Sequence, residues 1–209
     1  LTAQLLSTAV VFAVGFLMRP LGGWLLGIYA DRYGRKNALS LSVIMMGVGS
    51  LLIGATPGFA AIGFVAPVLL VAARLLQGLS VGGEFGTSAT YLSEVATPGK
   101  RGFYSSFQYV SMTAGQIVGL GLQIVLQRTM SDGALHDYGW RIPFVLGALG
   151  AAVVFYLRRN MLETDVYEAE SVEDEGEERG TLRALWRHKR EAFLVIALTM
   201  GGTVAYYTY

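Results

Sequence analysis

Six long apolar segments separated by charged links dominate this 209-residue sequence. A helix needs about 20 consecutive apolar residues to cross a bilayer, and each segment approaches or exceeds that length. Charged residues make up only 15% of the chain, against about 25% in an ordinary soluble domain. The pattern therefore predicts an all-α protein, a polytopic helical bundle in a membrane. The expected spans are residues 3–28, 38–55, 67–95, 103–126, 140–157 and 191–209.

The links between these spans differ in charge. Basic residues gather in the links 27–36, 97–102 and 158–190, whereas the link TPGFAAIGFV after the second span carries no charge. Because loops rich in lysine and arginine stay in the cytoplasm, we expect a multi-pass protein with these three links on the cytoplasmic side. Leu1 then starts on the outer side. We therefore expect one span before Leu1 and further spans after Tyr209.

The link 158–190 is the only polar segment of any size in the sequence. Its centre, ETDVYEAESVEDEGEE, is a dense acidic run that cannot bury apolar surface. Such a composition predicts a solvated tether between two bundles.

Two ionisable residues, Arg19 and Glu84, fall near the middle of long apolar stretches. A charge at the bilayer centre costs at least about 2.5–3.5 kcal/mol, so such residues normally face a polar pathway inside the protein. Counted back from Tyr29 and Glu94, both lie roughly 15 Å from the cytoplasmic edge, near the midplane. We predict that they lie close together, with Arg19 binding an anion and Glu84 taking up a proton. The alternative is an internal ion pair that never titrates.

The third span carries a polar edge beside a stripe of glycines. At about 100° per residue, Arg74, Gln77 and Glu84 fall on one side of the helix. These side chains line a polar pathway or only hydrogen-bond to neighbouring helices. The adjoining small-xxx-small stripe, which allows another helix to approach closely, consists of Gly78, Gly82 and Gly86.

The fourth span repeats this pattern with glutamines. Gln108 and Gln116 share one helical face, as expected of a helix that lines a hydrated cavity. Glutamines at this spacing can also hold helices together without binding a ligand. The candidate substrate-binding residues are therefore Arg19, Arg74, Gln77, Tyr91, Gln108 and Gln116.

The link GIYADRYGRK, residues 27–36, combines glycines with a charge cluster at fixed spacing. Gly27 is expected to allow close helix packing, and Gly34 to allow a tight reversal of the chain. The charged residues can pair with others at the neighbouring cytoplasmic helix ends, which suggests a conformational latch. Its candidate members are Gly27, Asp31, Arg32, Gly34, Arg35, Glu94 and Arg101.

Several classes of function are disfavoured by residues that the sequence lacks. There is no cysteine, and the two histidines, His136 and His188, lie outside the apolar segments, so we expect no metal site. An intramembrane enzyme would need a nucleophile with a base, or a metal cluster, and the spans offer neither. We therefore expect no enzyme, and a net charge of +1 gives no indication of nucleic acid binding. Composition alone leaves a channel open.

The link 27–36 matches the G-x-x-x-D-R-x-G-R-K signature of the major facilitator superfamily, which the chain resembles. The segments RLLQGLSVGGEFGTSATYLSEVATPGKRG and YGWRIPFVLG narrow the resemblance to metabolite:proton symporters. STAVVFAVGFLMRPLGGW and KRGFYSSFQYV are most similar to carriers of α-ketoglutarate within that family. The resemblance runs along essentially the whole chain and is weakest in the acidic link.

The resemblance implies a major facilitator fold of two six-helix halves, of which this chain would supply about spans 2 to 7 of 12. Residues 1–157 would then form most of the N-terminal half, 158–190 the central cytoplasmic loop, and 191–209 the start of the C-terminal half. The implied latch residues are Asp31, Gly34, Arg35 and Glu94.

The function implied is proton-coupled symport of a small carboxylate, α-ketoglutarate first, across the cell inner membrane by alternating access. The alternatives are symport of proline or betaine, or of another organic acid such as citrate or shikimate. The expected partners are the substrate, protons and the lipid bilayer. We expect a monomer that uses no cofactor.

Overall fold

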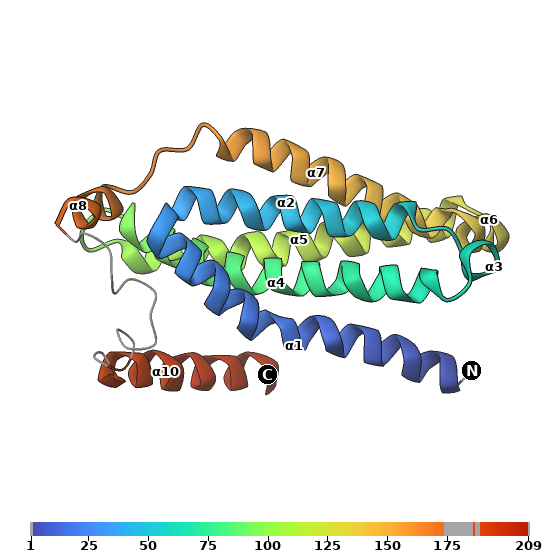
Figure 1. Ribbon diagram of the computed structural model, residues 1–209, viewed down its shortest axis with the longest axis horizontal. Coiled ribbons are helices and arrows are strands. Elements are labelled where there is room, and N and C mark those ends of the chain that lie inside the picture. Colours follow the sequence, from blue (N-terminus) through green and yellow to red (C-terminus); the bar gives the residue numbers. More distant parts are fainter. Residues whose placement is uncertain (1, 174–185, 187–188, 209) are drawn as a thin grey trace.

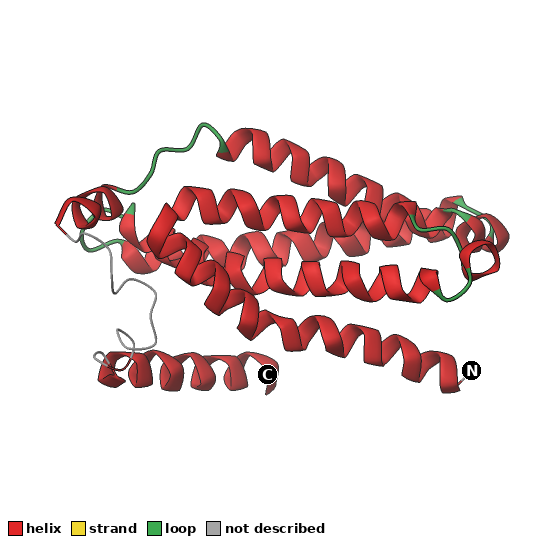
Figure 2. Cartoon of the chain, in the orientation of Figure 1, coloured by secondary structure: helices red, strands yellow, loops and turns green. Residues whose placement is uncertain are grey.

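The computed structural model describes residues 2–173, 186 and 189–208, and every regular element in that part of the chain is a helix (Figure 1, Figure 2). The all-α prediction is confirmed. In chain order the elements are α1 (Thr2–Tyr33), α2 (Arg35–Ala55), α3 (Phe59–Ile62), α4 (Val65–Glu94), α5 (Arg101–Thr129), α6 (Asp132–Asp137), the 3-10 helix η1 (Gly139–Arg141), α7 (Ile142–Arg158), α8 (Asp165–Glu173) and α10 (Lys189–Thr208).

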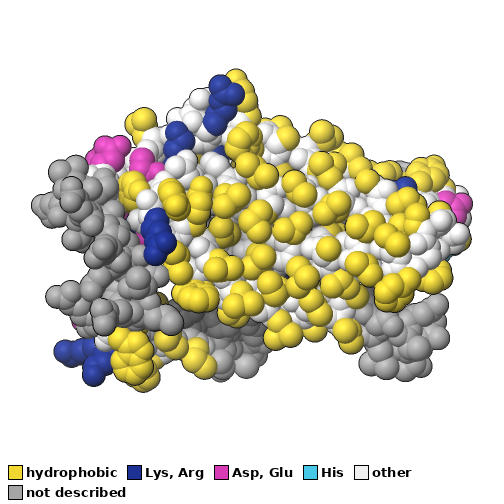
Figure 3. Space-filling model, viewed as in Figure 1, with side chains coloured by type: hydrophobic (Ala, Val, Ile, Leu, Met, Phe, Trp, Pro, Cys, Tyr) yellow, Lys and Arg dark blue, Asp and Glu magenta, His cyan; other side chains and the backbone are white. Residues whose placement is uncertain are grey.

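Five helices of the described residues are long and apolar enough to cross a membrane: α1, α2, α4, α5, and α7 together with η1. They cover the first five predicted spans. The sixth predicted span corresponds to α10, whose last side chains lie outside the described residues. Hydrophobic side chains cover the visible flank of the bundle between its two ends, and charged side chains are found mainly at the ends (Figure 3). This is the distribution that a bilayer requires.

The core lies around α2, which runs between α7 and α4 in the bundle (Figure 1). Ala38, Leu39, Val43 and Ile53 are buried along it. By contrast, Gln108 is the only buried residue of α5. The described bundle thus has a tightly packed side at α2 and an open side at α5.

Glycines bring α1 and α4 into direct backbone contact. A Cβ at Gly78 or Gly82 would collide with the backbone of Gly15 or of Arg19, respectively. These contacts confirm the prediction that the glycine stripe of the third span admits another helix. The prediction was wrong for Gly86, where a Cβ would meet nothing within 4 Å.

The predicted link 27–36 is almost entirely helical. α1 continues through Pro20 to Tyr33, and α2 begins at Arg35, so Gly34 alone makes the reversal. Its φ of 98° lies in the left-handed region that glycine tolerates, as predicted. The expectation for Gly27 was wrong, because no atom lies within 4 Å of a Cβ placed there.

The links 27–36 and 97–102 lie at one end of the bundle together with residues 158–173, the described start of the third basic link (Figure 1). We call this end the basic end. The predicted acidic tether begins there, but its first part is not a tether: Asp165–Glu173 forms α8. Residues 174–178, the rest of the acidic run, lie outside the described part. The segment between α7 and α8 is held against the bundle by the contacts described next.

Candidate functional site

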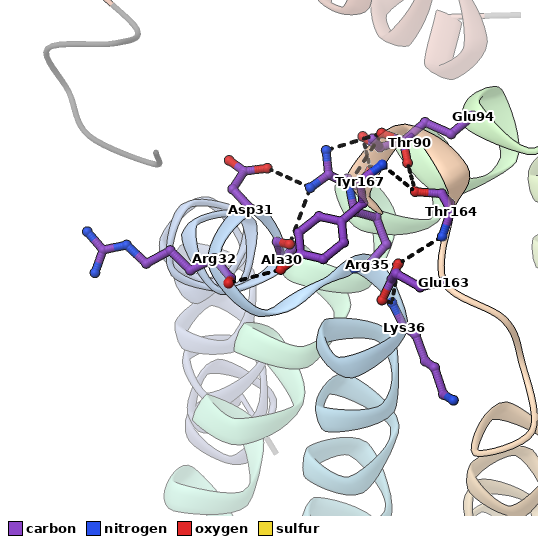
Figure 4. Close-up of polar contacts among 11 residues, drawn as sticks. Ala30, Asp31, Arg32, Arg35, Lys36, Thr90, Glu94, Glu163, Thr164 and Tyr167 are labelled. Atoms are coloured by element: carbon purple, nitrogen blue, oxygen red, sulfur yellow. Dashed lines mark hydrogen bonds and ion pairs between the residues drawn. The ribbon is translucent and has the colours of Figure 1, made fainter. Parts of the chain in front are cut away.

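Charged and polar side chains meet at the basic end, where α1, α2, α4 and the segment before α8 converge (Figure 4). The guanidinium of Arg35 lies at the centre, and its side chain is only 9% exposed. Nε and Nη2 donate to Oε1 of Glu94, at 3.3 and 3.1 Å. Nη1 donates to the carbonyl of Ala30 and lies 3.4 Å from Oδ1 of Asp31. We call this group the charged cluster; it consists of Asp31, Arg35, Glu94, Glu163 and Thr164.

The carboxylate of Glu163 caps the N-terminus of α2. It accepts from the backbone N–H of Arg35 at 3.0 Å and from that of Lys36 at 3.1 Å. N–H groups in the first turn of a helix have no intrahelical partner, and the helix dipole favours a negative charge there. Gly34 leaves room for the cap, because a Cβ at this position would collide with the Glu163 carboxylate.

Thr164 and Tyr167 complete the contact between α8 and the bundle. The buried hydroxyl of Thr164 donates to Oε2 of Glu94 at 2.6 Å and accepts from the backbone N–H of Tyr167 at 3.3 Å. The Tyr167 hydroxyl donates to the backbone carbonyl of Arg32 at 3.0 Å. The chain that leaves α7 is therefore bound to α1, α2 and α4 at once.

The structure brings together only part of the predicted latch. Asp31, Arg35 and Glu94 are in contact, and Gly34 lies directly beside them. Arg32 contributes its backbone carbonyl to Tyr167, while its side chain is exposed. The expectation that Arg101 joins the group was wrong, since the side chain of this exposed first residue of α5 makes no hydrogen bond or ion pair within the described chain.

Glu163 and Thr164 were missed at the sequence level. A threonine directly before a helix is a recognisable N-cap signal, and Thr164 precedes α8 by one residue. That signal lies inside a dense acidic run, which the composition assigns to a tether. The contact of Glu163 with α2 joins residues 128 positions apart, so no local pattern could have indicated it.

A second set of polar contacts lies within the membrane-spanning region. Nη1 of Arg74 donates to Oε1 of Gln77 at 3.0 Å, and Nε2 of Gln77 donates to the hydroxyl of Ser50 on α2 at 3.2 Å. Cζ of Arg74 lies 4.7 Å from the centre of the Phe12 ring. Nε of Arg74 is buried and has no hydrogen-bond partner in the described residues. Two of the predicted substrate-binding residues are thus adjacent, and both touch neighbouring helices.

Glu84 forms an ion pair, but not with the predicted partner. Nη2 of Arg158 lies 2.6 Å from Oε1 of Glu84, and Nη1 donates to the carbonyl of Leu39 at 2.7 Å. Arg158 is the last residue of α7, and its side chain is 18% exposed. One guanidinium therefore joins α7 to both α4 and α2. Its length explains the pairing, because an arginine at a helix end can reach inward along the bundle.

Arg19 lies elsewhere, and the predicted Arg19–Glu84 pair was wrong. The backbone of Arg19 packs on Gly82, which directs its side chain away from the contact between α1 and α4. The residue is exposed, and its Cζ lies 3.9 Å from the centre of the Phe16 ring. Within the described residues its guanidinium has no hydrogen bond or ion pair.

The remaining candidates lie in three different environments. Gln108 is buried, and its Nε2 donates to the carbonyl of Phe85 at 3.0 Å, so it holds α5 to α4. Gln116 is exposed on α5. Tyr91 donates from its hydroxyl to the carbonyl of Leu162 at 3.3 Å, which places it at the basic end beside the charged cluster.

No group of three or more histidine, cysteine, aspartate or glutamate residues that could hold a metal ion is found among the described residues. The arrangement contains cationic groups inside the membrane-spanning region, one embedded carboxylate with a counter-ion, and a charged cluster at one end. These parts can bind an anion, exchange a proton and hold helix ends together.

The model of the family described as "Sugar (and other) transporter" matches residues 2–200. The chain is 54% identical to the alpha-ketoglutarate permease of Escherichia coli strain K12, over 100% of this chain and 47% of that protein. It is 41% identical to a citrate-proton symporter of Salmonella typhi, over 94% of this chain and 46% of the relative. It is 31% identical to a proline/betaine transporter of Salmonella typhimurium, over 99% of this chain and 43% of that relative. The chain spans about half the length of these relatives.

Solved structures agree on the fold. The partially occluded inward-open xylose transporter XylE from E. coli superposes with a TM-score of 0.69 at 21% identity, over 79% of this chain and 41% of that one. A D-xylose-proton symporter superposes with a TM-score of 0.69 at 20% identity, over 93% of this chain and 45% of that one. At such identity the likeness concerns the arrangement of helices.

Proposed function

Because the chain belongs to the sugar and other transporter family of the major facilitator superfamily, we propose that it acts in a proton-coupled symporter for a small carboxylate. α-Ketoglutarate is the first candidate. The observation that carries this choice is the 54% identity, along all of this chain, to a permease named for that substrate. Transport proceeds by alternating access, with the basic end facing the cytoplasm of a cell whose inner membrane holds the protein.

Arg19 supports an anionic substrate. It is a cation in the membrane-spanning part of α1, its guanidinium rests on an aromatic ring, and it meets no carboxylate among the described residues. A planar guanidinium can bind a carboxylate through two parallel hydrogen bonds. We assign Arg19 to a substrate carboxylate. Arg74 and Gln77, already bonded to each other, supply a second polar contact, and Gln116 a third from the exposed face of α5.

Two other predicted substrate contacts receive different roles. Gln108 is assigned to helix packing, because its amide is engaged by the carbonyl of Phe85. Tyr91 is assigned to the basic end, because its hydroxyl is engaged by Leu162 in the segment that leads to α8. Both side chains are therefore removed from the proposed substrate site.

Glu84 is the proposed proton carrier. It is a carboxylate inside a membrane-spanning helix, and it is half-exposed although Arg158 is bound to one of its oxygens. A carboxylate in this setting can exchange a proton at the cost of its ion pair, which couples protonation to the position of α7. Glu84→Gln mimics the protonated state and should keep substrate exchange while losing accumulation driven by a proton gradient.

The charged cluster is the proposed conformational latch. The pair of Arg35 and Glu94 joins α2 to α4, and Asp31 joins α1 to the same guanidinium. Glu163 and Thr164 bind the chain after α7 to these helices. Residues 1–157 would move as most of one half of the transporter, with 158–190 as the loop to a second half that 191–209 begins. The unit would be a monomer without a cofactor.

Relatives named for citrate, shikimate and proline or betaine support the alternative substrates, at 31–41% identity. The test is uptake of labelled α-ketoglutarate by the full-length protein in membrane vesicles, with and without an inward proton gradient, in competition with citrate, succinate and proline. Gradient-driven uptake that succinate or citrate competes for, but proline does not, is expected. Uptake of proline in preference to every carboxylate would contradict the proposal.

A further inference from the structure

The segment that follows α7 is tied to the bundle at two depths. At the basic end, Glu163 and Thr164 bind α2 and Glu94. Deeper in the bundle, Arg158 binds Glu84. Glu84 precedes Glu94 by ten residues on α4, which is about 15 Å along a helix. On the α7 side, Glu163 follows Arg158 by only five positions.

We propose that Arg158 is a positioning residue that links the charge of Glu84 to the charged cluster. This rests on the proposed function in one respect, namely that Glu84 takes up a proton. With Glu84 ionised, Arg158 holds the end of α7 against α4 and α2, and Glu163 reaches the N-terminus of α2. When Glu84 accepts a proton, Arg158 loses its counter-ion and the end of α7 is released. Glu163 and Thr164 then withdraw from the cluster.

The energetics favour such a link. Protonation of Glu84 removes the negative charge that attracts the guanidinium of Arg158, so the electrostatic part of this contact is lost. Arginine cannot give up its own charge, and an unpaired cation is costly inside a bundle. Arg158 must therefore move toward water. Because it is the last residue of α7, its movement is passed directly to the segment that carries Glu163.

The surroundings of Glu84 make Arg158 its only charged contact within the described residues. From α2, the carbonyl of Leu39 accepts a hydrogen bond from the same guanidinium. From α5 the nearby polar group is the amide of Gln108, which is engaged by Phe85. From α1, the backbone of Arg19 packs on Gly82, two residues before Glu84 on α4. The carboxylates of Asp31, Glu94 and Glu163 belong to the charged cluster at the basic end, and the Tyr91 hydroxyl beside that cluster is bound to Leu162.

A buried cysteine beneath the cluster can report its opening. Ala30 is 5% exposed, and its carbonyl accepts a hydrogen bond from Arg35. Residues 1–209 contain no cysteine, so Ala30→Cys gives this part of the protein a single thiol. Its rate of alkylation by N-ethylmaleimide from the basic side of vesicles made with the full-length protein measures exposure of the cluster. Thr97→Cys, in an exposed link at the same end, corrects for the intrinsic pH dependence of the reagent.

The expected result in the parent is a corrected alkylation rate that is low at alkaline pH and rises as the pH is lowered. Glu84→Gln and Arg158→Gln should each raise the alkaline rate by about fivefold to tenfold, as expected for a lost, partly buried ion pair. Both should also abolish its pH dependence. Arg158→Lys should keep part of the response. The matched control is Arg159→Gln, an exposed neighbour whose guanidinium rests on Tyr156; it should behave as the parent does.

A parent-like pH response in Arg158→Gln would overturn the inference, and so would a low, unchanged rate in Glu84→Gln. The readout needs no substrate, so it separates this inference from the proposed function. If the protein takes up α-ketoglutarate under a proton gradient but Glu84→Gln does not change the alkylation rate, the link between Glu84 and the cluster is refuted and the proposed function is not. A Glu84-dependent opening in a protein that does not transport α-ketoglutarate supports the link and refutes the substrate.

Discussion

The charged cluster at the basic end and the polar residues within the membrane-spanning region use the same residue types in opposite ways. Arg35 is nearly buried, and each terminal nitrogen of its guanidinium is engaged by the chain. Arg19 is exposed, and its guanidinium rests on Phe16 without a hydrogen bond from the described residues. An arginine satisfied by its own chain holds a conformation, whereas an unsatisfied one is available to a ligand.

Glu84 and Arg158 lie between these two extremes. They are paired, as the cluster residues are, but they remain 32% and 18% exposed and lie inside the membrane-spanning helices. A pair of this kind is stable enough to fix a helix end and accessible enough to be broken by a proton. The difference between the regions therefore suggests a division of labour among binding, coupling and locking.

Arg19→Ala should have the largest effect of the variants considered, because it removes the proposed contact with the substrate carboxylate. Loss of a desolvated charge contact to a ligand costs about 3 kcal/mol, which corresponds to about a 100-fold loss of uptake. Arg19→Lys should recover only part of the activity, since an ammonium cannot form two parallel hydrogen bonds. The measurement is initial uptake of labelled α-ketoglutarate at matched expression.

The control for this variant is Arg128→Ala, at the exposed last turn of α5, where a charge contributes little. Its uptake should stay within a factor of about two. Near-normal uptake by a well-expressed Arg19→Ala protein would show that Arg19 on α1 does not bind the substrate anion.

Arg35→Ala should lower the maximal uptake rate about tenfold, because it leaves the nearly buried carboxylate of Glu94 without its charged partner. Arg101→Ala offers a matched comparison from the predicted latch: an exposed arginine at the same end that is not part of the cluster. It should transport as the parent does. Equal loss in both variants would mean that basic charge at this end, and not the cluster geometry, governs the rate.

Glu163→Ala should have a smaller effect, a threefold to fivefold lower rate, since loss of a helix cap costs about 1 kcal/mol. Asp165→Asn is its control, an exposed acid two residues further along. Uptake kinetics of the two variants check this expectation. Unchanged rate in Glu163→Ala would exclude the chain after α7 from the latch.

The smallest expected effect separates the two glutamines of α5. Gln108→Leu loses one buried hydrogen bond to Phe85, about 1 kcal/mol, and should lower the melting temperature in detergent by roughly 2–4 °C. Gln116→Leu removes an exposed amide and should leave the melting temperature unchanged. Equal shifts in the two proteins would contradict the assignment of Gln108 to packing.

The sequence was sufficient to predict the helices and their order, because apolar length and basic links are local signals. It also predicted the reversal at Gly34 and the close packing at Gly78 and Gly82, which depend on residue size alone. The partner of Glu84 could not be predicted in this way. Depth arguments place residues along a helix but not around its neighbours, and Arg158 reaches Glu84 from the end of a different helix.

The most direct test of this division of labour is equilibrium binding of α-ketoglutarate to the purified full-length Arg19→Ala and Arg35→Ala proteins, measured alongside their uptake. Arg19→Ala should lose binding and uptake together. Arg35→Ala should bind with an affinity within about a factor of three of the parent while its maximal rate falls. Retained binding in Arg19→Ala, or weakened binding at a normal rate in Arg35→Ala, would contradict the account.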